Sequence, residues 1–241
     1  MVGWVLEHLP HSQCYVEPFA GSAAVLFAKP PSKVEVLNDL DGGVRAFFTA
    51  LRDHRDELAQ KCKLTPYSRQ EFAAARQASD DITIDVVEQA RRFFVIVTQG
   101  FGSVPATTGW SSPDPNHGEA VKVERLIDRF EQCADRLRHV HLESLDALEI
   151  IRRYDSPKTT FFVDPPYLWS TRSWAARQTF KQDYRAEFQT DDEHRLLLKT
   201  LNEVDAAVVL AGRANPIYDD MLTGWKRIDG PRNEVLWIKP G

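Results

Sequence analysis

The sequence has few cysteines and no paired spacing of metal ligands. Its three cysteines, Cys14, Cys62 and Cys133, lie far apart among 241 residues, and the chain contains no Cys-x-x-Cys and no His-x-x-x-His pair. Such pairs are typical of zinc sites, and closely spaced cysteines are typical of disulfide frameworks. We therefore expect neither a metal site nor a disulfide framework.

The sequence also lacks a long apolar run and an excess of positive charge. No segment is apolar for long enough to span a bilayer, and the start lacks the charged-then-apolar order of a signal sequence. The formal net charge is −5, so the overall balance favours no polyanionic partner. We expect a cytoplasmic protein without a membrane partner, in which any contact with nucleic acid uses a local basic surface.

The stretch Thr160–Tyr167 joins an apolar strand to an acidic, proline-rich end. Its residues up to Val163 are typical of a buried parallel strand, and Asp164 follows where that strand should stop. Pro165 and Pro166 have fixed φ angles and no backbone N–H to donate. The sequence therefore predicts a stiff loop that presents acceptor oxygens and the ring of Tyr167.

This loop suits an amino group attached to a flat ring, such as the exocyclic amine of adenine. That nitrogen is a poor nucleophile, and a carboxylate with a peptide carbonyl could stabilise the charge that develops as it attacks an electrophile. The ring of Tyr167 could stack on the base. An ordinary strand that ends in an Asp-Pro turn is the alternative interpretation of this stretch.

Near the start, Cys14–Glu17 predicts a strand that leads through a turn into a helical run ending near Phe27. The segment between strand and helix is Pro18–Ala24, which contains Gly21. A strand, a glycine turn and a helix in this order allow backbone to approach a nucleotide-like ligand closely. We expect Gly21 to be the point of closest approach, although an ordinary strand-to-helix turn explains the pattern equally well.

A second acidic strand end follows at Val34–Asp41. A carboxylate at the end of the second strand commonly binds the ribose hydroxyls of an adenosine-containing cofactor. We favour Asp39 for this role, with Asp41 as the alternative. Asp41 could equally be the N-cap of the helix that the apolar spacing predicts after Gly42.

Residues 55–138 carry helical patterns. Ser68 with Glu71 predicts a capping box, and Val123–Leu137 predicts one amphipathic helix. A long loop is expected between Gly100 and Gly118. Basic residues flank this loop, namely Arg91, Arg92, Lys122 and Arg125. They could contact DNA phosphates, or they could form a solvated helix face.

The pattern of alternating strands and helices resumes at Val140–Glu143, and Asp146 opens a helix. After Tyr167, aromatic and basic residues interleave in a way that suits a nucleic-acid groove: Trp169, Arg172, Trp174, Arg177, Phe180, Lys181, Tyr184 and Arg185. Thr190 with Glu193 predicts another capping box. A buried strand at Ala206–Ala211 and a β pair at Trp225–Ile228 and Glu234–Lys239 complete the expected fold.

Three motifs in this order resemble the Dam-like DNA adenine-N6 methyltransferases, whose methyl donor is S-adenosylmethionine (SAM). They are Val16–Gly21, similar to the cofactor motif; Asn38-Asp39, similar to the acidic ribose motif; and Asp164-Pro165-Pro166-Tyr167, similar to the catalytic motif. The resemblance covers nearly the whole chain. It implies methyl transfer to the N6 amino group of a flipped adenine in double-stranded DNA.

The resemblance also implies the fold and the site. We expect an α/β, Rossmann-like class I methyltransferase sheet formed by residues 1–54 and 139–241, with residues 55–138 inserted as a helical target-recognition lobe. Cofactor-binding residues would be Glu17, Pro18, Phe19, Ala20, Gly21, Asp39, Asp146 and Asp164. DNA-binding residues would be Arg91, Arg92, Arg125, Arg172, Lys181 and Tyr184. Tyr184 and Glu187 match a family Tyr-x-x-Glu element, and a restriction endonuclease is a possible partner.

The sequence departs from the family pattern at two places. Ala23 stands where a second glycine is expected, and the family's opening Pro-Gly-Gly-Lys element does not precede Gly3–Leu6. A catalytically weakened DNA-binding relic is therefore one alternative function. Methylation of cytosine N4 or of RNA is another, because the same pocket chemistry serves any exocyclic amine.

Overall fold

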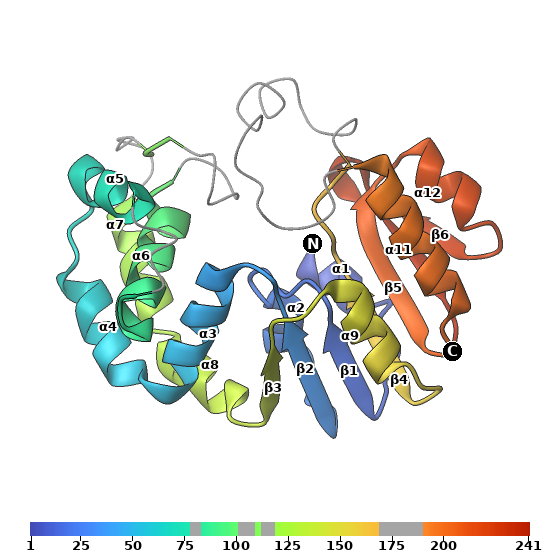
Figure 1. The fold of residues 1–241 in the computed structure, drawn as a ribbon, viewed down its shortest axis with the longest axis horizontal. Helices are drawn as coiled ribbons and strands as arrows, with labels where there is room; N and C mark the ends of the chain where they lie inside the picture. Colours follow the sequence, from blue (N-terminus) through green and yellow to red (C-terminus); the bar gives the residue numbers. More distant parts are fainter. Residues whose placement is uncertain (78–82, 101–108, 112–118, 169–189) are drawn as a thin grey trace. The chain divides into compact units, whose positions relative to one another are not determined.

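The computed structural model describes residues 1–77, 83–100, 109–111, 119–168 and 190–241. These residues form two compact units. The first, the sheet unit, contains residues 1–40, 139–168 and 190–241. The second, the helical unit, contains the described residues of 41–138. Figure 1 shows the elements of each unit.

The sheet unit is built on seven strands. They are β1 (Cys14–Glu17), β2 (Val34–Asn38), β3 (Val140–Glu143), β4 (Thr159–Val163), β5 (Ala207–Arg213), β6 (Lys226–Asp229) and β7 (Glu234–Lys239). Their order is β3-β2-β1-β4-β5-β7-β6. Only β7 runs antiparallel to its neighbours within this sheet. The expected Rossmann-like class I sheet is confirmed.

The order of the strands locates a functional edge. The chain builds outward from β1 toward β3 on one side and from β4 toward β5 on the other, so the order reverses between β1 and β4. In open α/β sheets, ligands bind beyond the carboxyl ends of the strands at such a reversal. The two motifs that follow β1 and β4 therefore meet where chemistry is expected.

In the part of the chain that the structure describes, six helical segments accompany the sheet. They are α1 (Val2–Leu6), α2 (Ala24–Ala28), α9 (Ala147–Tyr154), α11 (Asp191–Glu203), α12 (Pro216–Met221) and the 3₁₀ turn η2 (Pro231–Asn233). Figure 1 shows α9, α11 and α12 on one face of the sheet, with α1 and α2 on the other.

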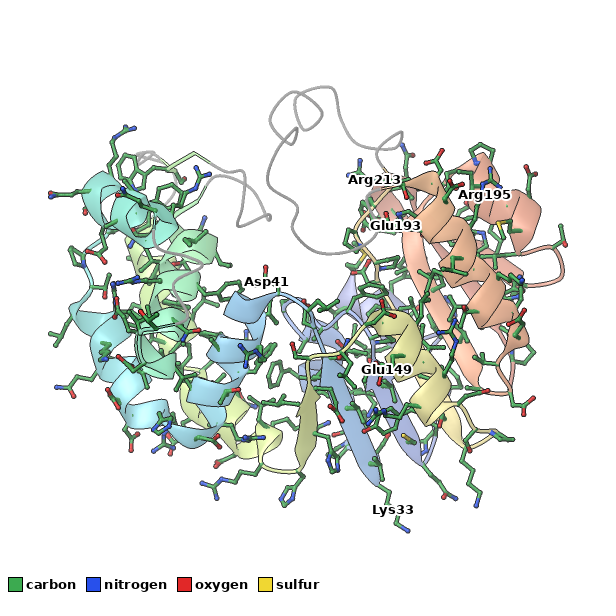
Figure 2. All side chains as sticks on the ribbon, in the orientation of Figure 1. Lys33, Asp41, Glu149, Glu193, Arg195 and Arg213 are labelled. Carbon is green, nitrogen blue, oxygen red and sulfur yellow. The ribbon has the colours of Figure 1, made fainter. Side chains whose placement is uncertain are left out.

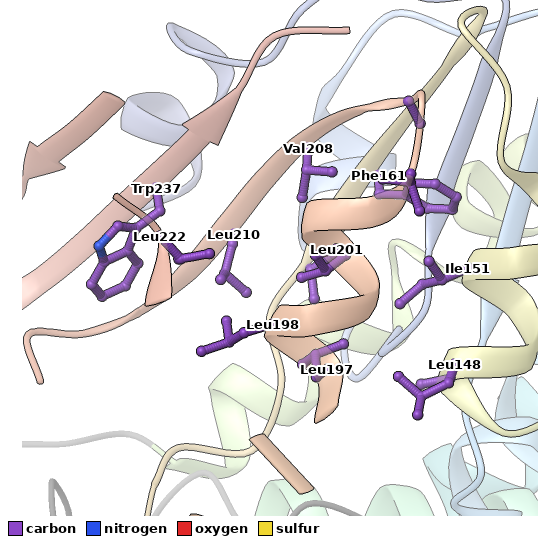
Figure 3. Packing of buried hydrophobic residues seen from close by; sticks show 14 of the residues in the cluster. Leu148, Ile151, Phe161, Leu197, Leu198, Leu201, Val208, Leu210, Leu222 and Trp237 are labelled. Atoms are coloured by element: carbon purple, nitrogen blue, oxygen red, sulfur yellow. The ribbon is translucent and has the colours of Figure 1, made fainter. Parts of the chain in front are cut away.

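The core lies between the sheet and the first of these helical layers. Leu197, Leu198 and Leu201 of α11 are fully buried and face apolar residues of β4 and β5, including Phe161 and Val208 (Figure 3). The helical spacing of these leucines and the continuous apolar runs of the strands are complementary, as expected for a parallel sheet covered on both faces.

The helical unit contains α3 (Gly42–Asp53), α4 (Arg55–Leu64), α5 (Arg69–Gln77), α6 (Val86–Gln99), α7 (Glu119–Ile127) and α8 (Phe130–Leu137). Phe47 of α3 stacks on Phe94 of α6 with ring centroids 5.9 Å apart, and its edge meets Phe130 of α8 at 5.7 Å. These contacts make α3 part of the helical unit, whereas the sequence analysis placed residues 41–54 with the catalytic domain.

One helix expected from the sequence is divided into two helices in the structure. The single helix expected at Val123–Leu137 is broken at Asp128 and Arg129, where the Arg129 N–H bonds to the Leu126 carbonyl in a tighter turn. This turn starts α8 at Phe130, which then reaches Phe47.

The two expected capping boxes have different outcomes. The box of Thr190 and Glu193 is complete. Ser68 does cap the Glu71 N–H, but the reciprocal bond is replaced because Gln99 accepts the Ser68 N–H and the Glu71 carboxylate binds Arg91.

Among the described residues, no helix is both long and apolar enough to cross a membrane.

Candidate active site

The turn after β1 brings backbone to the functional edge. Gly21 has a φ of +47° and Ala23 a φ of +51°, both in the left-handed region that favours glycine. Apart from Gly21 itself and its two neighbours in the chain, no heavy atom of the described residues lies within 4 Å of the position that a Cβ on Gly21 would occupy. The turn therefore leaves open space beside its backbone, as a close approach to a ligand requires.

Glu17 supports this turn from below. Its Oε1 accepts hydrogen bonds from the Tyr15 hydroxyl at 2.7 Å and from the Leu26 N–H at 2.9 Å, which ties the end of β1 to α2. Burial raises the pKa of Glu17 to about 8, although both hydrogen bonds oppose the shift. Its side chain thus fixes the turn, and its assignment as a cofactor residue stays a prediction.

Asp39 follows β2 and meets the same turn. Its Oδ2 accepts the Gly21 N–H at 2.9 Å, so the two motifs expected to bind one ligand are in direct contact. Asp41 instead accepts the N–H groups of Gly43 and Val44 as the N-cap of α3. The N-cap interpretation of Asp41 is confirmed, and the role of Asp39 at the ribose hydroxyls stays a prediction.

Asn38, which the sequence analysis names only as the neighbour of Asp39 in the acidic motif, is a connecting residue whose role was not expected. Its buried amide donates to the Pro18 carbonyl at 2.9 Å and to the Leu145 carbonyl at 3.0 Å, and its Oδ1 accepts the Leu145 N–H. It thereby joins the loops after β1, β2 and β3. The signal for this role in the sequence was a polar residue, Asn38, at the end of an apolar strand. The functional role was instead assigned to its charged neighbour, Asp39.

Asp146 opens α9 as expected. Its Oδ1 accepts the N–H groups of Leu148 and Glu149, at 2.8 and 3.1 Å. Because one oxygen makes both capping bonds and a carboxylate can accept several more, capping is compatible with a second role. The role at the adenine of SAM, which the family resemblance implies, stays a prediction.

Asp164 directly follows β4, next to the end of β1 in the sheet. Asp164 is an exposed residue, but neighbouring protein atoms raise its pKa to about 7, mainly by partial desolvation of the carboxylate and secondly through the negative charge of Glu234. Because solvent reaches the residue, it screens both effects. The negative charge of Asp164 in turn raises the pKa values of Glu17 and Tyr218, so it acts on both sides of the functional edge.

Two charged residues that the sequence analysis missed hold Tyr167. The Tyr167 hydroxyl donates to Glu234 Oε2 at 2.9 Å, and the guanidinium of Arg213 lies 5.3 Å from the centre of the ring. Figure 2 shows Arg213 at the carboxyl end of β5. The rule that identified Asp164, a charged residue where a buried strand stops, would also have identified Arg213.

The residues present fit SAM as the cofactor. The open space at Gly21 lies beside the carboxylate of Asp39, which can accept further hydrogen bonds. An adenosine moiety could therefore lie against the backbone of the turn, with its ribose hydroxyls donating to Asp39. Among the described side chains, no three of His, Cys, Asp or Glu gather as a metal site would require.

The proposed DNA-binding residues have different surroundings. Arg91 binds Glu88 and Glu71 at 2.7 and 2.5 Å, and Arg92 binds Glu88 at 2.9 Å, so both take part in ion pairs of the helical unit. Arg125 lies exposed on α7. Three other residues, Arg172, Lys181 and Tyr184, lie outside the described residues, as does Glu187.

Known proteins were compared with the chain by structure and by sequence. It is similar to two structures of the rRNA methyltransferase aviRa from Streptomyces viridochromogenes, one at 2.4 Å and one at 1.5 Å. The identities are 11% and 12% and the TM-scores 0.39 and 0.40, and each alignment covers 98% of this chain and 81% of the other. No curated protein sequence matches the chain.

The family comparison is decisive because of its extent. The model of the D12 class N6 adenine-specific DNA methyltransferases matches residues 1–219, which include the turn after β1, Asp39 and the stretch from Asp164 to Tyr167. The chain therefore belongs to this family, and it is a SAM-dependent DNA methyltransferase specific for adenine N6.

Proposed function

We propose that Asp164, Pro165, Pro166 and Tyr167 form the catalytic centre at which the adenine amino group is methylated. The observation that carries this proposal is the place of Asp164 directly after β4, beside β1 at the reversal of the strand order. Its carboxylate is thus an acidic group at the edge where the fold brings ligands, and it is close enough to Glu17 and Tyr218 to act on both electrostatically.

The catalytic loop would act by accepting hydrogen bonds. One N–H of the target amine would donate to the Asp164 carboxylate, and the other to a carbonyl of the Pro165-Pro166 pair, which has no backbone donors to compete. Tyr167 would stack on the flipped base. When bound, SAM supplies an electrophilic methyl group.

The protonation state of Asp164 matters for this role. Only the ionised carboxylate accepts hydrogen bonds with both oxygens and offsets positive charge on the attacking nitrogen. Since the pKa of Asp164 is raised to about 7, methyl transfer should increase with pH up to and slightly above neutrality. Transfer should become slow where the carboxyl is protonated.

The turn after β1 would hold the cofactor. Gly21 would offer its backbone, Asp39 would accept the ribose hydroxyls, and Pro18, Phe19 and Ala20 would line the approach. This assignment is supported by the Gly21–Asp39 hydrogen bond and by the open space beside Gly21.

The identity of the methylated base is tested by chemical analysis. DNA and RNA from cells that express the protein would be digested to nucleosides and analysed by mass spectrometry, and the DNA would also be sequenced with detection of modified bases. We expect N6-methyladenine in DNA at one recurring sequence. N4-methylcytosine or methylated RNA in its place would contradict the proposal.

We also propose that the helical unit recognises the DNA target. Support comes from exposed Arg125 on α7, whereas Arg91 is already neutralised by two carboxylates. Charge reversal at Arg125 should weaken DNA binding and flatten its salt dependence, with SAM binding unchanged. Reversal at exposed Arg153 of α9 in the sheet unit is the matched control. Equal effects of both reversals would contradict a specific role of α7.

A restriction endonuclease that reads the same sequence is a further proposed partner, supported only by the family resemblance. The modified sequence found in cellular DNA would identify endonucleases to test for blocked cleavage. The cytoplasmic location also stays a prediction, and it is tested by cell fractionation.

A further inference from the structure

The loop that follows Asp164 has few ways to be fixed by its own backbone. Pro165 and Pro166 have no N–H groups, so the orientation of the Tyr167 ring depends on side-chain contacts. The structure shows two of them, the hydrogen bond from the hydroxyl to Glu234 and the guanidinium of Arg213 against the ring. These contacts hold the tip of the ring and one of its faces.

The two partners come from one place in the sheet. Arg213 is the last residue of β5 and Glu234 is the first of β7, and they stand opposite each other in the antiparallel ladder. Glu234 is buried, so its carboxylate has a fixed position and a hydrogen bond to it is stronger than one to a solvated acid. The ladder thus fixes the geometry of the contact with Tyr167.

We propose that Glu234 is a positioning residue for methyl transfer, which holds the Tyr167 ring by its hydroxyl in the orientation that stacks on the target adenine. This inference rests on the proposed function of Asp164 and Tyr167. Because Arg213 covers one face of the ring, a base would stack on the opposite face, and rotation of the ring would misplace the base relative to Asp164. A misplacement of about 1 Å can slow a reaction by about 10²-fold.

Glu234 also acts on Asp164 through its charge. Its carboxylate is the second cause, after burial, of the raised pKa of Asp164. The charge of Asp164 in turn raises the pKa values of Glu17 of β1, Tyr167 of the loop and Tyr218 of α12, and the nearby cation Arg213 opposes the shift at Tyr167. Removal of the Glu234 charge should therefore lower the pKa of Asp164.

The experiment measures single-turnover transfer of tritiated methyl groups from SAM to unmethylated bacterial DNA, between pH 5.5 and 9. The variants are Tyr167→Phe, Glu234→Ala, their double variant and Glu234→Gln, which keeps an acceptor oxygen but removes the charge. Glu203→Gln, an exposed carboxylate at the end of α11, is the matched control. Calorimetric titration with SAM checks that each variant is folded.

We expect Tyr167→Phe and Glu234→Ala each to slow transfer by about tenfold, the scale of one hydrogen bond to a charged group. The double variant should be no slower than the slower single variant, because both changes remove the same contact. Glu234→Gln should retain the rate within about threefold at pH 8, and the pH of half-maximal rate should be lower than in the wild type. Glu203→Gln should change neither quantity.

Multiplied losses in the double variant, or a Glu234→Gln rate as low as that of Glu234→Ala at pH 8, would overturn the inference and leave the proposed function intact. A wild-type rate in Asp164→Ala would remove the proposed function itself. The two failures are therefore distinguishable in the same assay.

Discussion

Each of the two units contains a cation held by carboxylates, but at different depths. In the sheet unit, Lys29 binds Glu35 at 2.6 Å, and their side chains are 8% and 2% exposed. In the helical unit, Arg91 binds Glu88 at 2.7 Å, and those side chains are 15% and 22% exposed. The basic residues assigned to DNA from the sequence thus include two, Arg91 and Arg92, that are already paired within the protein. The helical spacing of a charged residue does not show which residue it pairs with.

Loss of the cation should therefore have its largest effect in the sheet unit. Lys29→Met leaves the Glu35 carboxylate buried without its cation and should lower the free energy of unfolding by about 3–5 kcal/mol. Arg91→Met should cost only about 1–2 kcal/mol, because water reaches its partners more readily. Urea unfolding of the two variants measures both values. Equal losses would mean that depth does not distinguish the pairs.

The second prediction concerns the catalytic carboxylate. Asp164→Ala should slow single-turnover methyl transfer by about 10² to 10³, the usual cost of one preorganised hydrogen-bond partner. SAM binding, measured by calorimetry, should change far less. Asp220→Ala, at an exposed carboxylate of α12, is the control and should transfer methyl groups at the wild-type rate.

The sequence predicts more of the sheet unit than of the helical unit. The carboxyl ends of parallel strands all lie at one edge of the sheet. Asp39 and Asp164 each follow a predicted parallel strand, so order and spacing alone assign both to that edge. Helices have no equivalent rule. The break at Asp128 and the contact of Phe47 with Phe130 depend on tertiary packing, so the end of one unit and the start of the other could not be placed by pattern.

Contacts across the sheet were equally hidden. Glu234 is 67 residues from Tyr167 in the sequence, and only the pairing of β7 with β5 brings it near the catalytic loop. Nothing in the stretch around Glu234 distinguishes it from an ordinary strand residue. Such a partner becomes visible only when strand order is known.

The third prediction uses the opposite pKa shifts of two glutamates. Burial raises the pKa of Glu17 to about 8, so its contribution to stability is present below its ordinary pKa of 4.5 and is lost as pH rises through 8. The Arg91 hydrogen bond lowers the pKa of Glu88, so that contribution is present above 4.5 and is lost as pH falls through the lowered value.

Glutamine variants should therefore have opposite dependences on pH. Between pH 5 and 8.5, Glu17→Gln should gain stability relative to the wild type by up to about 4 kcal/mol, since one unit of pKa corresponds to about 1.4 kcal/mol and about three units of the shift lie in this range. Glu88→Gln should be less stable than the wild type at pH 7, and the difference should shrink below pH 4.5. Chemical denaturation across this range measures both, and parallel curves would contradict the assignment.

The smallest effect is expected at Ala23, where the family pattern has glycine. Its φ of +51° is a left-handed conformation that costs a residue with a Cβ about 1 kcal/mol, and glycine would remove that cost. Ala23 is also buried, so glycine loses a methyl group worth about 0.8 kcal/mol. The two effects nearly cancel, and Ala23→Gly should change the free energy of unfolding by less than about 0.5 kcal/mol.

Ala50 provides the matched control in the helical unit. It is equally buried but lies inside α3, where glycine adds a helix penalty of about 1 kcal/mol to the lost methyl group. Ala50→Gly should therefore cost about 2 kcal/mol in the same urea titration. Because β-branched residues avoid the left-handed region, Ala23→Val should be destabilising by more than about 1 kcal/mol. A loss of about 2 kcal/mol in Ala23→Gly, as in Ala50→Gly, would mean that the turn after β1 stores no strain at Ala23.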